Sequence, residues 1–86
     1  MDEPDVQVSY CEQAGHRQLR IASDAGAIDL LQPTTGYGMI VVSTVPDGTE
    51  LERYYGLDMA IDHAADYLDI PVRAIAIPDA AKSMGI

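Results

Sequence analysis

Met39-Ile40-Val41-Val42-Ser43-Thr44-Val45 is the stretch that decides the fold, because it has the strongest strand pattern in the chain. β-branched residues favour strands, and apolar side chains at consecutive positions are typical of a strand that is buried on both faces. We therefore expect a central strand of a sheet. The next residues, Val45-Pro46-Asp47-Gly48-Thr49, predict a tight turn, because proline presets φ and glycine supplies a left-handed position.

Two continuations after this turn are open. Thr49-Glu50-Leu51-Glu52 fits a capping box, in which a threonine and a glutamate three residues later satisfy the first amides of a helix. Alternatively, Glu50 to Tyr55 pairs back on the central strand as a fifth strand. We favour the helix slightly, and the sequence leaves the state of residues 50–55 undecided.

Residues Leu57–Asp69 predict the main helix. At 100° per residue, five apolar side chains fall within one sector about 100° wide, namely Leu57, Ile61, Ala64, Ala65 and Leu68. Four aspartates share a neighbouring sector about 80° wide, namely Asp58, Asp62, Asp66 and Asp69. The helix should stop before Pro71, because a proline ring disfavours the helical conformation in the residue that precedes it.

The residues before the central strand predict a hairpin and a third strand. Val6 to Tyr10 alternates apolar and polar residues, and the same pattern returns at Leu19 and Ile21. Ala14-Gly15-His16 lies between them, so residues 5–23 are interpreted as a β-hairpin with a short polar loop. Ala27 to Gln32 then favours a third strand over a short helix, and the Pro33-Thr34-Thr35-Gly36 run that follows predicts a turn.

The end of the chain predicts one more strand, Val72 to Ile77, and a last helical turn that Asp79 caps and that runs through Met84 to Gly85. Together the elements predict a single α+β domain over residues 1–86, with a mostly antiparallel sheet of four to five strands and one main helix on one face. Because one helix covers one face, the far side of the central strand needs the hairpin, the C-terminal turn or a second copy. We expect a homodimer.

Charge is the strongest compositional feature. Fourteen acidic residues face five basic ones, Lys82 is the single lysine, and the formal net charge is −9. In this composition the chain resembles the small acidic proteins of extreme halophiles, which implies adaptation to dense salt. At 1 M salt, screening reduces the range of the repulsion between charges to about 3 Å. The resemblance carries no motif and no site. So few cations disfavour a nucleic-acid partner.

Membrane, redox and cofactor functions have no support in the sequence. No apolar run approaches the roughly 20 residues that cross a bilayer, and the acidic start Met1-Asp2-Glu3-Pro4-Asp5 differs from a basic signal peptide, so we expect a cytoplasmic protein. Cys11 has no cysteine partner and lies in an alternating segment, which predicts a half-buried structural thiol. We expect no cofactor.

Metal and phosphate sites are also disfavoured. Asp58, Asp62 and Asp66 recur at every fourth position, but carboxylates on successive turns of one helix point outward side by side and do not surround a cation. His16 and Cys11 lack the companion ligands of a zinc site. Gly36-Tyr37-Gly38 precedes a strand and has no basic neighbour, so it predicts a hairpin turn instead of a phosphate loop. We expect no metal.

His63, Tyr54 and Tyr55 are the candidate contact residues. His63 lies between the apolar and acidic sectors, and Asp66, three residues on, is placed to orient its ring. The Tyr54-Tyr55 pair beside the helix combines apolar area with polar tips, as interface residues do. We favour a protein that acts by association without catalysis, and the alternative is a ligand-binding or enzymatic domain with a pocket at a dimer seam around these three residues.

Overall fold

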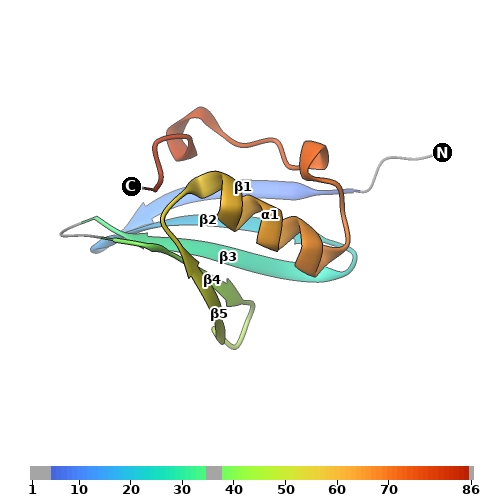
Figure 1. The fold of residues 1–86 in the computed structure, drawn as a ribbon, viewed down its shortest axis with the longest axis horizontal. Helices are drawn as coiled ribbons and strands as arrows, with labels where there is room; N and C mark the ends of the chain where they lie inside the picture. The colour runs from blue at the N-terminus through green and yellow to red at the C-terminus, as the bar shows by residue number, and fades with distance from the viewer. Residues whose placement is uncertain (1–4, 35–37, 86) are drawn as a thin grey trace.

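The computed structural model describes residues 5–34 and 38–85 and has an α+β fold, which confirms the predicted class (Figure 1). Five strands lie in chain order in one sheet, and each is antiparallel to the next. One helix packs against the sheet, and two short 3₁₀ turns follow it. The elements are β1 (Gln7–Gln13), β2 (His16–Ser23), β3 (Gly26–Pro33), β4 (Ile40–Thr44), β5 (Glu50–Tyr54), α1 (Leu57–Leu68), η1 (Val72–Ala74) and η2 (Asp79–Ala81).

The N-terminal half follows the sequence pattern. β1 and β2 form the predicted hairpin and pair from Gln7↔Ala22 to Gln13↔His16, so His16 begins β2 and does not lie in the loop as expected. Gly15 has a φ of 84°, a left-handed value that glycine adopts without strain in a tight turn. The predicted third strand is β3. The turns predicted at residues 33–36 and 36–38 include residues 35–37, which lie outside the described part of the chain.

Residues 50–54 form a strand, so the favoured helix at Thr49 is wrong. Thr49 takes no N-cap role: its hydroxyl donates to Asp47 Oδ2 at 3.1 Å, and its N–H donates to Thr44 Oγ1 at 3.0 Å. Both contacts close the β4–β5 turn. β5 then pairs with β4 up to Ile40↔Tyr54. Pairing with a buried strand gives hydrogen-bond partners to the backbone of the whole segment, whereas a capping box bonds only the first amides of a helix.

The predicted strand at residues 72–77 is also wrong. Residues 72–74 form the 3₁₀ turn η1, and Ile75 is buried in the core at 6% exposure. Pro71 and Pro78 bracket this segment, and prolines lack the N–H that a sheet ladder needs. The later helical turn is confirmed only in part, because η2 spans Asp79–Ala81 and Pro78, not Asp79, is its N-cap residue.

The core lies between α1 and one face of the sheet, here called the inner face. The sheet contributes side chains with no exposed surface from three strands, namely Leu19, Ile21, Ile28, Leu30, Ile40 and Val42. The helix contributes four residues of its predicted apolar stripe, together with Ala60 in place of the half-buried Leu57, and its buried residues are Ala60, Ile61, Ala64, Ala65 and Leu68. Three alanines on this face allow the helix backbone to approach the sheet closely. The predicted helix is therefore confirmed, with Asp69 as its left-handed C-cap residue at φ 56°.

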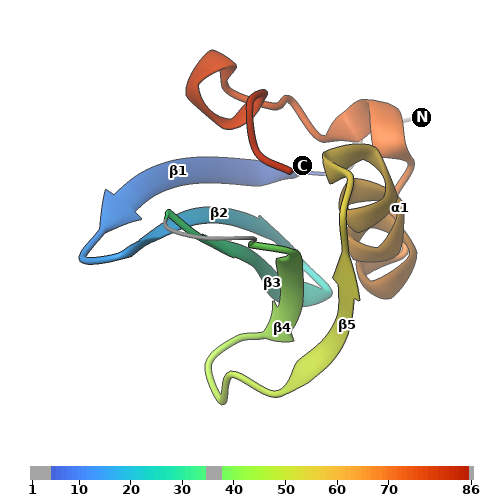
Figure 2. The same ribbon diagram turned by 60° about the vertical axis from the view of Figure 1, so that its left-hand side comes forward.

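The segment after α1 packs on the same core and is held by two polar side chains. It adds Ile75, Ala81 and Met84 to the core. Gln32, 7% exposed, accepts a hydrogen bond from the Gly85 N–H and donates to the Gly85 and Gly38 carbonyls. Arg17 donates to the Ala80 carbonyl at 2.8 Å and to Ser83 Oγ at 2.7 Å. The end of the chain is therefore tied back to β2 and β3 (Figure 2).

The other side of the sheet, here called the outer face, has no covering element among residues 5–34 and 38–85. Leu31 and Val41 follow or precede core residues in their strands, so they point to this face, and both are half-buried. Asp29 is buried at 8% exposure and accepts two hydrogen bonds from Arg20, at 2.7 and 2.9 Å. These bonds raise the pKa of Arg20. The sequence predicts another element on this face. The structure instead places the Arg20–Asp29 pair there, beside the half-buried Leu31 and Val41.

Candidate functional site

The end of β5 and the helix α1 bring two of the three candidate residues together. Tyr54 ends β5 opposite Ile40, and Gly56 begins the helix in an extended conformation. This short connection lays the last residue of the strand beside the second turn of the helix. The Tyr54 hydroxyl then lies 3.0 Å from His63 Nδ1, and the two rings meet edge to face with centroids 5.8 Å apart.

Tyr54 and His63 line an open depression on the surface, with a volume of about 390 Å³. Met59, Asp62 and Asp66 complete its lining, and Met59 is 56% exposed. Both aspartates are exposed, so the rim is negative. The partner that the structure gives to His63 is Tyr54, and not Asp66 as the sequence suggested.

Tyr55 lies outside this depression. It is 65% exposed, and it follows Tyr54 directly where the chain leaves the strand. Successive residues of an extended chain point to opposite sides, which explains why only one of the two tyrosines reaches His63. The sequence had no signal for Met59 and Asp62 as further lining residues beyond the position of Met59 one turn before His63.

The chemistry of the depression suits a positively charged group. Two carboxylates supply negative potential, Tyr54 supplies an aromatic surface, and Met59 supplies exposed apolar area. His63 and Tyr54 exchange one hydrogen bond, whose direction depends on the tautomer of the ring. Among residues 5–34 and 38–85, no three side chains of His, Cys, Asp or Glu are grouped as metal ligands are.

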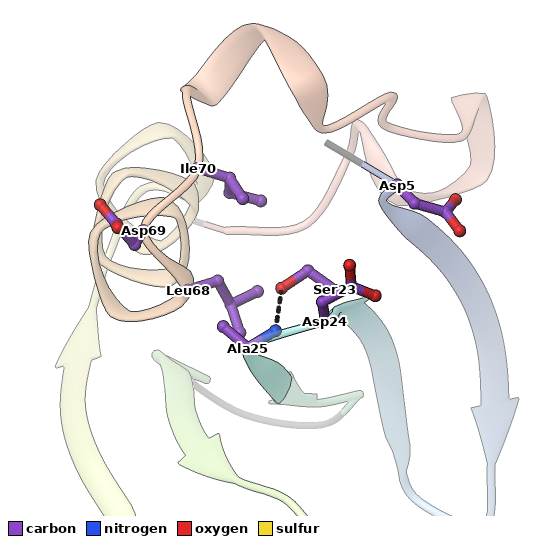
Figure 3. Close-up of a pocket in the computed structure, with 7 residues that line it drawn as sticks. All are labelled: Asp5, Ser23, Asp24, Ala25, Leu68, Asp69 and Ile70. Carbon is purple, nitrogen blue, oxygen red and sulfur yellow. Dashed lines mark hydrogen bonds between the residues drawn. The ribbon is translucent and has the colours of Figure 1, made fainter. Parts of the chain in front are cut away.

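A second hollow lies where α1 ends, between that end and the β2–β3 turn (Figure 3). Leu68 and Ile70 point into it, and the Asp69 carboxylate points away. Ser23 Oγ is already engaged, because it accepts a hydrogen bond from the Ala25 N–H at 3.1 Å. The volume is about 230 Å³. Its acidic residues do not converge on one point, so we assign no ligand to it.

The other residues considered for chemistry form no metal-ligand group in the described part of the chain. Cys11 lies half-buried in β1 and pairs with Gln18, as its alternating segment predicted. His16 pairs with Gln13 at the turn end of the same ladder, two residue pairs from Cys11. The acidic stripe of α1 is exposed along its length, with Asp58, Asp62, Asp66 and Asp69 all at the surface. None of the helices in the described part has the length and hydropathy to span a bilayer.

The fold and this site define a small α+β protein in which a five-stranded antiparallel sheet carries one helix, with a Tyr–His contact at the junction of β5 and α1. The chain belongs to a family of unknown function, DUF7111, whose model matches residues 1–86. No curated protein matches the chain, and no solved structure matches it.

Proposed function

We propose that this protein acts by association, as a salt-adapted homodimer of the cytoplasm, and that it catalyses no reaction of its own. The observation that carries the proposal is the charge of the outer face of the sheet. Its charged side chains form two ion pairs, Arg20–Asp29 and Arg53–Glu50, so their formal charges cancel although the chain carries −9. A second acidic copy can therefore approach the sheet, and not the acidic helix, without strong repulsion.

The opposite side of the molecule explains why association needs dense salt. The exposed aspartates of α1 place four negative charges on one helix. Two copies repel each other over about 10 Å at 0.1 M salt and over about 3 Å at 1 M. The proposed dimer should therefore form at high ionic strength, with the acidic helix of each copy directed away from its partner.

Sedimentation equilibrium at micromolar concentration in 2 M KCl tests this function. We expect a dimer, that is, twice the chain mass of 9.3 kDa. We expect the dimer to weaken when the KCl concentration is lowered in steps, before the far-ultraviolet circular dichroism changes. A monomer in 2 M KCl at all concentrations contradicts the proposal.

A second candidate function is the binding of an organic cation in the Tyr54–His63 depression, and the hydrogen bond between these two residues favours it. A guanidinium group would stack on Tyr54 and approach Asp62 and Asp66. Titration with methylguanidinium, followed by the His63 ring signals in NMR, is the test. Saturable shifts that disappear when Asp62→Asn and Asp66→Asn are combined support it, because this variant removes both carboxylates of the depression. Shifts that grow linearly with ligand concentration, or that persist unchanged in this variant, count against it.

A further inference from the structure

We propose that the second copy pairs with the free edge of β1, so that two five-stranded sheets join edge to edge in antiparallel orientation. This inference rests on the proposed homodimer and names the surface that forms it. The outer face itself requires no partner, because one face of an antiparallel sheet commonly meets water. A sheet edge is different, since its backbone groups remain available for pairing.

The two edges of the sheet are protected to different degrees. β5 is five residues long, three of them are charged (Glu50, Glu52 and Arg53), and the register shifts beside it between Val42 and Ser43. Charges, short length and bulges are the devices by which proteins block edge pairing. β1 has seven residues, Gln-Val-Ser-Tyr-Cys-Glu-Gln, with one charge at Glu12. β1 therefore lacks the charges, the short length and the register shift that protect the β5 edge.

The backbone of β1 offers hydrogen-bonding groups at this edge. The β1–β2 turn has two residues between Gln13 and His16, and a β-turn is closed by a bond between its first and fourth residues. Because bonded pairs alternate along an antiparallel ladder, Val8, Tyr10 and Glu12 turn their N–H and C=O groups to the free edge. The loop and C-terminal backbone hydrogen bonds between described residues do not include these groups.

Charge directs a second copy to the same place. Residues 6–23 contain one acidic residue, Glu12, and two arginines, Arg17 and Arg20, and because Arg20 is paired with Asp29, the hairpin is neutral in a chain of −9. The Glu12 carboxylate accepts a hydrogen bond from the Tyr10 hydroxyl, which in turn accepts one from Arg17 Nε. The single negative charge of β1 thus lies in a network with a cation. The hairpin is the part of this acidic molecule that repels another copy least.

Pairing would also cover apolar surface at the rim of the core. Val8 and Tyr10 are half-buried and pack against the core from β1, the edge strand of the sheet. A strand added beside them would cover both side chains. Antiparallel pairing of β1 with itself is a two-fold contact, which closes at a dimer and leaves no further β1 edge free.

A matched pair of variants, Glu12→Pro and Glu12→Ala, tests the contact by sedimentation in 2 M KCl. Both remove the carboxylate, but only proline removes the N–H that faces the free edge, and an edge strand tolerates proline where its N–H faces solvent. We expect Glu12→Ala to dimerise like wild type and Glu12→Pro to dimerise at least about tenfold more weakly. Equal dimerisation of the two variants, strong or weak, overturns the edge contact, while a dimeric wild type keeps the proposed function.

Amide hydrogen exchange of the wild-type protein gives a second test that needs no variant. Above the dimerisation concentration, the Val8 and Tyr10 amides should exchange at least about tenfold more slowly than in diluted monomer, whereas the amides of β5 should not change. Unchanged exchange at Val8 and Tyr10 in a protein that sediments as a dimer overturns the β1 edge as the interface. A protein that stays monomeric overturns both the edge contact and the homodimer.

Discussion

Gln32 is the residue that most directly ties the end of the chain to the sheet. It is a polar residue at the end of an apolar strand, 7% exposed, and its amide contacts the backbone of Gly85 and Gly38. Removing a buried amide that bonds several backbone groups lowers stability in two ways. The hydrogen bonds are lost, and the backbone groups stay partly buried without a partner.

We predict that Gln32→Leu lowers the free energy of unfolding by about 1–3 kcal/mol. Urea denaturation in 2 M KCl measures the change. Gln18→Leu is the matched control, because Gln18 is half-buried in β2 on the outer face, away from the C-terminal segment. Equal stabilities of the two variants would show that the Gly85 contact contributes little.

Asp47 makes the β4–β5 turn sensitive to acid. The hydroxyls of Thr44 and Thr49 donate to its carboxylate and hold its pKa below the ordinary value of 3.8. The unfolded chain keeps the ordinary pKa, so it binds more protons than the folded protein as the pH falls past that value. The stabilisation is therefore complete above the unfolded-state pKa and is lost as the pH falls through the lower, folded-state pKa.

We predict that wild type is more stable than Asp47→Ala at neutral pH and that the difference decreases as the pH falls below 3.8. Chemical denaturation of both proteins at a series of pH values, in constant 2 M KCl, measures this difference. Subtracting the free energy of unfolding of Asp47→Ala from that of wild type at each pH removes the effects of the other acidic groups. A gap that stays constant to pH 2.5 would show that the two threonine contacts do not depend on the ionised carboxylate.

At the scale of elements, the sequence predicted each strand that shows apolar alternation or β-branched composition. The hairpin, β3, β4 and α1 all lie where the pattern indicated. β5 was beyond local reasoning, because Thr49-Glu50-Leu51-Glu52 suits a helix and the backbone of β4 decides otherwise. Val72–Ile77 has the composition of a strand, but Ile75 is buried in the core and the two prolines limit pairing. Both outcomes depend on tertiary contacts that a local pattern does not contain.

The candidate site was predictable to the same extent. The 100° period of α1 placed His63 at the border of the apolar and acidic sectors, and it is half-buried in the structure. Its contact with Tyr54 requires β5 to be a strand that ends beside the helix, so a prediction that favoured a helix at Thr49 could not find it. For the same reason, the sequence pattern does not separate Tyr54, which contacts His63, from the exposed Tyr55.

The acidic stripe of α1 is exposed in the structure, and the repulsion between its neighbouring aspartates can be calculated. Its neighbours Asp58/Asp62, Asp62/Asp66 and Asp66/Asp69 are like-charged pairs three or four residues apart. Each such pair costs about 0.2–0.5 kcal/mol, so together they cost about 1 kcal/mol at low ionic strength.

We predict that Asp62→Asn combined with Asp66→Asn lowers the KCl concentration at the midpoint of folding, because this double variant removes all three pairs. Circular dichroism across a KCl titration measures the midpoint. A loss of stability in the variant would indicate that the stripe binds a cation, and it would contradict the hydrated surface.

At the scale of the whole molecule, the formal charge of −9 is larger than the four negative charges of the α1 stripe. A chain of this length has an expected stability of about 4–13 kcal/mol, so a local cost of about 1 kcal/mol along α1 cannot unfold it. The rest of the proposed salt requirement would therefore come from repulsion across the molecule. That repulsion acts on the folded state and, in the proposed dimer, on the approach of two copies.

A second double variant separates the two sources. Asp24→Asn combined with Glu52→Gln changes the net charge by the same +2 as the α1 variant, but it removes exposed acids from the β2–β3 turn and from β5, far apart in the chain. We predict that it also lowers the KCl midpoint, by a smaller amount, because it relieves long-range repulsion without removing the like-charged pairs of α1.

The free energies of unfolding of the two double variants should differ by about 1 kcal/mol at low salt. This difference should vanish above about 1 M KCl, where the Debye length is about 3 Å. If the two midpoints are equal, the salt requirement depends on net charge alone; if the second variant has the wild-type midpoint, the requirement arises in the α1 stripe and not in the charge of the whole molecule.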